Sequence, residues 1–300
     1  MRCLRTTARQ EVAEWEALFP NGVFVHLVIY ADESGTHDRT GEERGAREAV
    51  LGGIAGLRDN WLSFRNGWGA VLEKYNATYF HYRKWRAADR VIRLKEDAAS
   101  DFNENPYRSW SAEDLRAFII ELATVAGSGD YIPVGSHVFT QRFYRAKIKG
   151  DVALTSDPYE RMANDFFSST IDIIGKLRPP WKRLPVNFIF DGPPKDPRWR
   201  HTISDAFEAH KRQNPRSTFS WGCTDKTDPE NFPLQAADLV AYRGRIAAGS
   251  WLDLNPDAFW LEVDGHIFKS VFDWMTAHKE IMLPYILSGG LFDYDEYKDR

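Results

Sequence analysis

The residues VFVHLVIYADESG, Val23 to Gly35, run from an apolar stretch directly into an acidic turn. A run this apolar predicts a strand that is buried on both faces of a sheet. The stretch ends at Asp32, and a carboxylate at the edge of a core is costly unless hydrogen bonds, a cation or a metal compensates for it. This segment therefore predicts both the first strand of a layered fold and a polar site at the end of that strand.

Two further acids stand in comparable surroundings. Asp191 closes the apolar run VNFIF, and Asp238 lies inside the helix-like stretch Leu234 to Tyr242, LQAADLVAY. Apolar residues three and four positions away share the helix face of Asp238, so we expect this face to pack on the sheet. Three carboxylates that converge form a hard, oxygen-only ligand set, which suits Mg²⁺ or Mn²⁺ better than zinc. The pattern therefore predicts a site for a divalent metal.

Outward from these runs, strands alternate with helices, which predicts an α/β fold with a mixed sheet because the first two strands read as an antiparallel hairpin. The expected strands lie at 23–31, 49–56, 131–139, 186–190 and 217–223, and the expected helices at 12–19, 60–75, 111–122, 158–177, 198–212 and 234–242. We expect one elaborated domain over 1–300, with a core over about 23–249. A charged surface insertion over 81–110 and a C-terminal helical extension over 250–300 complete the prediction.

The composition is that of a globular protein, with 43% hydrophobic and 27% charged residues in 300. A net charge of −4 neither indicates nor excludes a nucleic-acid partner, because a formal sum does not describe a local groove. Cys3 and Cys223 are the only cysteines and form no C-x-x-C pair, which argues against a thiolate zinc site and a disulfide framework. No window approaches the ~18 consecutive apolar residues of a membrane span, and the basic start lacks the apolar stretch of a signal peptide. We therefore expect a cytoplasmic protein with no membrane partner.

The motifs together resemble a known family. Y-x-D-E-S-G at Tyr30 to Gly35, G-G at 52–53, F-H at 80–81, a strand that ends in Asp191, and L-Q-x-A-D-L at Leu234 to Leu239 occur here in the order typical of the family called domain of unknown function 3800. That family is placed with the ribonuclease H-like superfamily, whose members bear acids on the first strand, the fourth strand and a late helix. The resemblance covers about 24–248 and implies a ribonuclease H-like mixed β-sheet flanked by helices, with helical insertions.

The resemblance also implies roles for individual residues. Asp32, Asp191 and Asp238 are implied to ligate catalytic Mg²⁺ or Mn²⁺, and Glu33 to be a further catalytic acid. The residues expected to contact the substrate or to support the acids are Ser34, His81, Lys226 and Gln235. The chain departs from the family at Tyr79, where an acid is common, and the fourth carboxylate typical of ribonuclease H is not evident.

These residues predict a metal-dependent nuclease or related phosphodiesterase that hydrolyses DNA or RNA by a two-metal mechanism. One alternative is a non-catalytic nucleic-acid-binding or interaction module of the same fold, in a defence or mobile-element system, and another is a hydrolase of a smaller phosphoester. The same residues also allow purely structural interpretations. In these, DESG is a turn, Asp238 pairs with Arg243, His81 is a core residue and Lys226 is an exposed surface residue. Basic and aromatic residues interleave over 81–95, where they would contact phosphates and stack bases, or form a solvated face.

Overall fold

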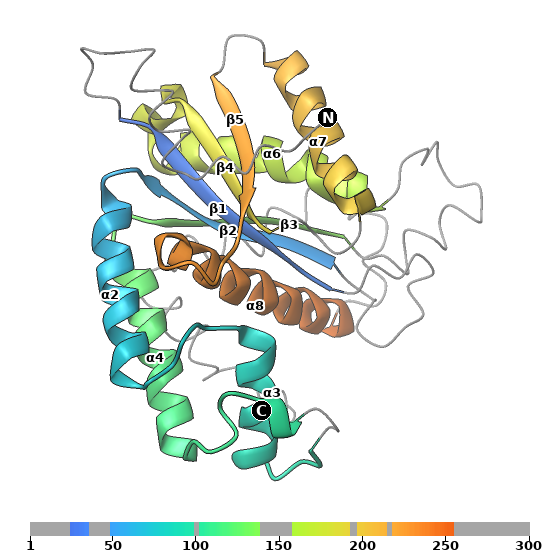
Figure 1. Ribbon diagram of the computed structural model, residues 1–300. Helices are drawn as coiled ribbons and strands as arrows, with labels where there is room; N and C mark the ends of the chain where they lie inside the picture. Colours follow the sequence, from blue (N-terminus) through green and yellow to red (C-terminus); the bar gives the residue numbers. More distant parts are fainter. Residues whose placement is uncertain are drawn as a thin grey trace, which may run out of the picture.

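The computed structural model describes residues 25–35, 49–98, 102–138, 158–192, 197–214 and 218–254, and it contains a mixed five-stranded sheet (Figure 1). The strands are β1 (Leu27–Ser34), β2 (Ala49–Leu57), β3 (Ile132–Val138), β4 (Val186–Asp191) and β5 (Phe219–Thr224), in the order β3-β2-β1-β4-β5. β2 is antiparallel to both β1 and β3, whereas β4 is parallel to both β1 and β5. The predicted α/β class, mixed sheet and opening hairpin are confirmed.

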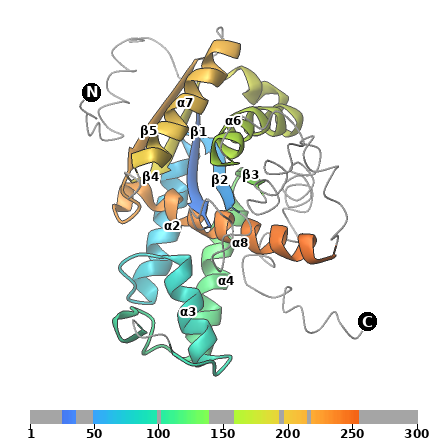
Figure 2. The same cartoon turned by 90° about the vertical axis from the view of Figure 1, so that its right-hand side faces the viewer.

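Helices cover both faces of the sheet (Figures 1 and 2). α6 (Pro158–Leu177) and α7 (Pro197–Gln213) lie on one face, and α8 (Phe232–Leu254) crosses the other. On the α8 side lie α2 (Asn60–Lys74), α3 (Tyr82–Ile92) and α4 (Ala112–Ser128), and short 3₁₀ turns occur at η1 (Phe102–Glu104), η2 (Pro179–Arg183) and η3 (Pro229–Asn231). None of the helices in the described part of the chain is long and apolar enough to cross a membrane.

Each face of the sheet has its own hydrophobic core. Because successive strand residues point to opposite faces, Val28 and Tyr30 of β1 pack with the residues of α2, α3, α4 and α8. Leu27 and Ile29 pack instead with α6 and α7. The same alternation places Ile189 of β4 in the first core. This parity determines which face each acid of the sheet occupies.

Gly52 brings α8 directly against the sheet. It is the partner of Asp32 in the antiparallel β1–β2 ladder. A Cβ atom at Gly52 would lie 2.5 Å from the Cα atom and 2.7 Å from the nitrogen of Ala241 in α8, closer than real Cβ atoms approach other heavy atoms. The contacted atoms belong to the backbone, so no side-chain rotation could relieve this contact. The missing side chain therefore allows α8 to lie beside the strand that bears Asp32.

The segment 81–110, which we expected as a charged insertion over the surface, contributes buried side chains to the helical layer on the α8 side in its described part. Its helix α3 buries Tyr82, Trp85 and Ala88, which recur every third residue and so share one face. The indole Nε1 of Trp85 donates a hydrogen bond to the carbonyl oxygen of Leu115 in α4 at 3.0 Å. The arginines and lysines between these residues occupy the other face of α3. Their charge obscured the helical periodicity of the apolar residues in the sequence.

Other details of the prediction have definite outcomes. The capping box of Ser111 and Asp114 is present at the start of α4, and α6 begins at Pro158 as expected. β3 contains Pro133 and lies at an edge of the sheet, where a missing N–H is tolerated. β1 continues to Ser34, so Asp32 lies within the strand rather than after it. The predicted helix 12–19 and residues 255–300 of the predicted extension lie outside the described residues.

Candidate active site

Three carboxylates meet at one edge of the sheet, around the ammonium group of a lysine. The Oδ2 atoms of Asp32 and Asp191 lie 2.8 and 3.0 Å from Nζ of Lys226, and the Oδ2 atom of Asp238 lies 3.9 Å from it. Asp32 is near the carboxyl end of β1, Asp191 is the last residue of β4, and Asp238 is in the second turn of α8. The structure thus brings together the three acids that the sequence singled out; we call these acids and Lys226 the acid cluster.

The strand pattern explains why the acids converge. β1 and β4 are parallel neighbours, so their carboxyl ends lie at the same edge of the sheet. Asp32 shares the face of Val28 and Tyr30, and Asp191 shares the face of Ile189, by the period of two along a strand. This is the face that α8 covers, so Asp238 approaches the same point from the helix.

Backbone hydrogen bonds orient the two strand carboxylates. The Oδ1 atom of Asp32 accepts a hydrogen bond from the N–H of Glu33 at 2.8 Å. The Oδ1 atom of Asp191 accepts from the N–H groups of Gly192 and Lys226 at 3.0 and 3.1 Å. In each carboxylate one oxygen is therefore held by the backbone, and the other contacts the shared cationic centre. Such an arrangement prepares the Oδ2 atoms to bind a positive charge.

Lys226 is not the exposed surface lysine of the default interpretation. Its side chain is only 15% exposed and forms ion pairs with all three acids. It lies two residues beyond Thr224, the end of β5, and Thr224 is the register partner of Asp191. Because β5 is parallel to β4, the chain leaves β5 at the edge where the acids gather. This position relative to a parallel strand was the signal in the sequence that could have identified Lys226.

Burial and mutual repulsion perturb the acids of the cluster. Burial raises the pKa of Asp32 to about 8; the Lys226 ammonium opposes this rise, and the Asp238 and Asp191 carboxylates add to it. Burial alone would also raise the pKa of Asp238, but Lys226 and His81 outweigh it and hold that pKa below its ordinary value. Burial lowers the pKa of Lys226, yet the surrounding carboxylates outweigh burial and raise it. One ammonium therefore does not fully compensate three carboxylates.

Asp238 is also held by the start of α3. Its Oδ2 atom accepts a hydrogen bond from the N–H of Tyr82 at 2.9 Å, and Nδ1 of His81 lies 3.3 Å from the same oxygen. The His81 side chain is 30% exposed, which places it between the buried acid and the solvent. His81 therefore lies at the boundary of the acid cluster rather than within the hydrophobic core.

Gln235 links three parts of the site. Its side-chain oxygen accepts hydrogen bonds from the indole Nε1 of Trp68 and from the N–H of Phe80, both at 2.9 Å. Its side-chain nitrogen donates to the carbonyl oxygen of Lys226 at 2.8 Å. Gln235 is fully buried, and its hydrogen bonds join Trp68 of the core, the segment before His81 and the loop of Lys226. The prediction that Gln235 orients its neighbours agrees with these contacts.

Replacing Gln235 by Leu is expected to destabilise the protein. The buried N–H groups of Trp68 and Phe80 would lose their acceptor, and each unsatisfied buried group costs about 1–3 kcal/mol. Urea unfolding measures the change in the free energy of unfolding. Trp68→Phe removes one of the two donors, so the loss caused by Gln235→Leu should be smaller in that background. Equal losses in the two backgrounds would contradict the proposed link.

Two predicted residues lie apart from the cluster. Glu33 follows Asp32 directly in β1, so its side chain points to the opposite face of the sheet, toward α6 and α7. Ser34 shares the face of Asp32, but its hydroxyl accepts a hydrogen bond from Nε of Arg245 in α8 at 3.2 Å. The structure therefore places Glu33 away from the shared centre and gives Ser34 a contact with α8.

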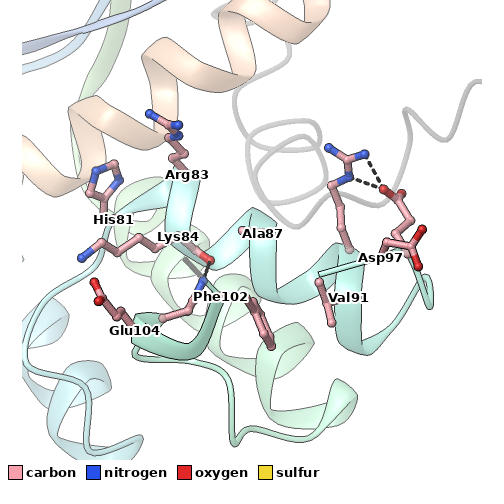
Figure 3. Close-up of a pocket in the computed structure, with 11 residues that line it drawn as sticks. His81, Arg83, Lys84, Ala87, Val91, Asp97, Phe102 and Glu104 are labelled. Atoms are coloured by element: carbon pink, nitrogen blue, oxygen red, sulfur yellow. Dashed lines mark hydrogen bonds and ion pairs between the residues drawn. The ribbon is translucent and has the colours of Figure 1, made fainter. Parts of the chain in front are cut away.

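A pocket of about 410 Å³ begins beside the acid cluster (Figure 3). His81 and Arg83 lie at the end of the pocket nearest to α8, and Asp97 lies at the opposite end. Lys84 also lines the pocket and donates a hydrogen bond to the hydroxyl of Tyr79 at 2.7 Å. Tyr79, which departs from the family pattern, thus supports a pocket lysine. Through His81, which lies beside Asp238, the pocket adjoins the acid cluster, and its lining holds the acidic Glu96, Asp97 and Glu104 as well as basic side chains.

The donor set of the cluster fits Mg²⁺ or Mn²⁺ by its chemistry, because both ions favour carboxylate oxygens. Three such oxygens already lie within 4 Å of one cationic atom, which is Nζ of Lys226. They are arranged around an ammonium group: across the residues that the structure describes, no group of three or more His, Cys, Asp and Glu side chains has a geometry that could itself hold a metal ion. Metal binding here would require the cluster to rearrange around the lysine.

Comparison with known proteins identifies no related protein. A scan against protein-family models finds no match for the chain, and a search of curated proteins finds none. The resemblance to the domain of unknown function 3800 therefore stays a prediction from the motifs.

Proposed function

We propose that this protein is a divalent-metal-dependent nuclease or phosphodiesterase of ribonuclease H-like fold that hydrolyses phosphodiester bonds of nucleic acid. The observation that carries the proposal is the meeting of the Oδ2 atoms of Asp32, Asp191 and Asp238 around one positive charge. The acids lie on β1, β4 and α8, which agrees with the first strand, fourth strand and late helix that the resemblance implied. The proposal also explains why three buried or half-buried acids, which would repel one another, lie close together.

Asp32 and Asp191 would hold Mg²⁺ or Mn²⁺ through their Oδ2 atoms, since their Oδ1 atoms accept backbone hydrogen bonds. Asp238 would complete the ligand set from α8. When bound, such ions activate a water molecule and stabilise the leaving oxygen in phosphodiester hydrolysis. His81, beside Asp238 and at the end of the pocket nearest to α8, would position the phosphate next to the acids.

The pocket supports a phosphodiester as the substrate. Arg83 and Lys84 line it beside His81, and cationic side chains of this kind contact the phosphates of nucleic acids. Phe102 also lines the pocket and offers an aromatic face on which a base can stack. The pairing of basic side chains with an aromatic ring is the feature of the pocket that supports a nucleic-acid substrate.

Cleavage assays test the function directly. We expect the wild-type protein to cut at least one of single-stranded DNA, duplex DNA, RNA and an RNA/DNA hybrid with Mn²⁺ or Mg²⁺, and to leave all of them intact with a chelator. A chromogenic phosphodiester in a parallel assay separates the substrate classes. Turnover of that compound with every polynucleotide intact would assign the protein to smaller phosphoesters and contradict the nuclease proposal.

The Lys226 ammonium between the carboxylates favours one alternative function. A lysine that permanently fills the cationic centre would leave a non-catalytic nucleic-acid-binding module. Such a module would bind nucleic acid with strong salt dependence and yield no products with any divalent ion. Binding in a mobility-shift assay, combined with intact substrates in the cleavage assay, would support this alternative.

A further inference from the structure

Lys226 occupies the position at which a metal ion would contact the same oxygens. Its Nζ atom lies 2.8 and 3.0 Å from the Oδ2 atoms of Asp32 and Asp191, so it fills the space between these two oxygens. Mg²⁺ binds carboxylate oxygens at about 2.0–2.1 Å. An ion at that distance from both oxygens and the ammonium group cannot share this space. The ammonium and the ion are therefore alternatives at one centre.

Electrostatic repulsion also prevents the Lys226 ammonium and a divalent ion from occupying the centre together. An ammonium and a divalent ion a few ångströms apart repel each other, and the repulsion is strong where water is scarce. The side chains of Asp32 and Asp238 are only 8% and 7% exposed, so these two acids are largely removed from water. Without either cation, however, three carboxylates would face one another. The cluster therefore favours the presence of one cation at a time, either the ammonium or the metal ion.

The lysine is held so that only its side chain needs to move. Its N–H donates to Asp191 and its carbonyl oxygen accepts from Gln235, so the backbone is bonded on both sides. The adjoining loop is held too, because the side-chain nitrogen of Asn231 donates to Thr224 and to the carbonyl oxygen of Asp225. The flexible four-carbon stem of lysine allows the ammonium to leave while this backbone stays in place.

We propose that Lys226 is a displaceable counter-ion, whose ammonium group neutralises the acid cluster in the metal-free protein and is expelled when a divalent ion binds the same carboxylates. This inference rests on the proposed metal-dependent function and adds its regulation: metal affinity is limited by the cost of moving the lysine. The expelled ammonium stays attached to the edge of the site, where it can contact a phosphate of the substrate.

Chemical labelling of the wild-type protein tests the displacement without a mutation. Acetic anhydride modifies accessible amines, and mass spectrometry reports the extent of modification at each lysine. We expect saturating Mn²⁺ to increase the labelling of Lys226 several-fold. Lys74, whose exposed ammonium on α2 pairs with Glu121 on α4, provides the internal reference and should not change. Unchanged or lower labelling of Lys226 at saturating Mn²⁺ would overturn the inference.

Calorimetric titration with Mn²⁺ tests the competition. We expect Lys226→Met to bind Mn²⁺ at least about tenfold more tightly than the wild type, since a repelling charge is removed from the centre. Lys226→Arg keeps the charge and should not tighten binding, and Lys74→Met should match the wild type. A thermal scan checks folding, and the metal-free Lys226→Met variant should melt below the wild type and gain more from Mn²⁺.

The outcomes separate the inference from the proposed function. Equal Mn²⁺ affinity in the wild type and Lys226→Met would overturn the inference and leave the metal site in place. Absence of Mn²⁺ binding in both proteins would overturn the inference and the metal-dependent function together. If Lys226→Met does not fold without metal, the labelling of the wild-type protein decides the question.

Discussion

Replacing Asp191 by Asn is expected to abolish metal-dependent cleavage while the fold is retained. The amide keeps an oxygen that can accept the hydrogen bonds from Gly192 and Lys226, so the local backbone should persist. The amide nitrogen would replace the Oδ2 atom that lies 3.0 Å from the Lys226 ammonium, and the negative charge is lost. Loss of a partner that only orients a metal ligand already costs about 10–100-fold in affinity or activity, so loss of a ligand should cost more than about 100-fold.

Initial rates of cleavage with Mn²⁺ measure this effect, and circular dichroism with a thermal melt checks the fold. Asp165→Asn is the matched control, because Asp165 pairs with Arg161 on α6, on the opposite face of the sheet. The control should cleave at the wild-type rate. An Asp191→Asn protein that retains wild-type rates would exclude Asp191 from the reaction and contradict the proposed site.

Replacing Gly52 by Ala is expected to destabilise the protein and to impair the site. The added Cβ atom would lie 2.5 Å from the Cα atom of Ala241, so α8 or β2 would have to move. Overpacking of this kind typically costs about 1–3 kcal/mol, and the rigid backbone contact places this change at the upper end. Asp238 precedes Ala241 by less than one helical turn, so a shift of α8 would also move this acid from the cluster.

Urea unfolding and the cleavage rate with Mn²⁺ measure the two consequences separately. Gly67→Ala is the control, since Gly67 lies inside α2 and its added Cβ would meet only the two side-chain methyl groups of Val125, at 3.3 and 3.5 Å. Alanine is the better helix former by about 1 kcal/mol, so this control should be neutral or slightly stabilising. Wild-type stability and activity in Gly52→Ala would show that α8 does not depend on the close approach.

The regular elements and the three acids could be predicted because their signals are local. An apolar run that ends in an acid identified the strands of Asp32 and Asp191, and the helical period assigned Asp238 to a packed face. The hairpin of β1 and β2 and the capping box of α4 also depend on neighbours in sequence. Tertiary structure was not needed for these assignments, since local backbone geometry determines which side chains share a face.

The sequence by itself determined the mixed α/β class and singled out the acids, but only the tertiary structure decided what surrounds them. Lys226 lies 194 residues from Asp32 in sequence, and its ion pair has no periodic signature. The packing of α3 on α4 and the contact of Gly52 with Ala241 likewise join distant segments. Such contacts depend on how buried surfaces fit together and on charge balance in the folded chain, and neither property is encoded in a run of neighbouring residues.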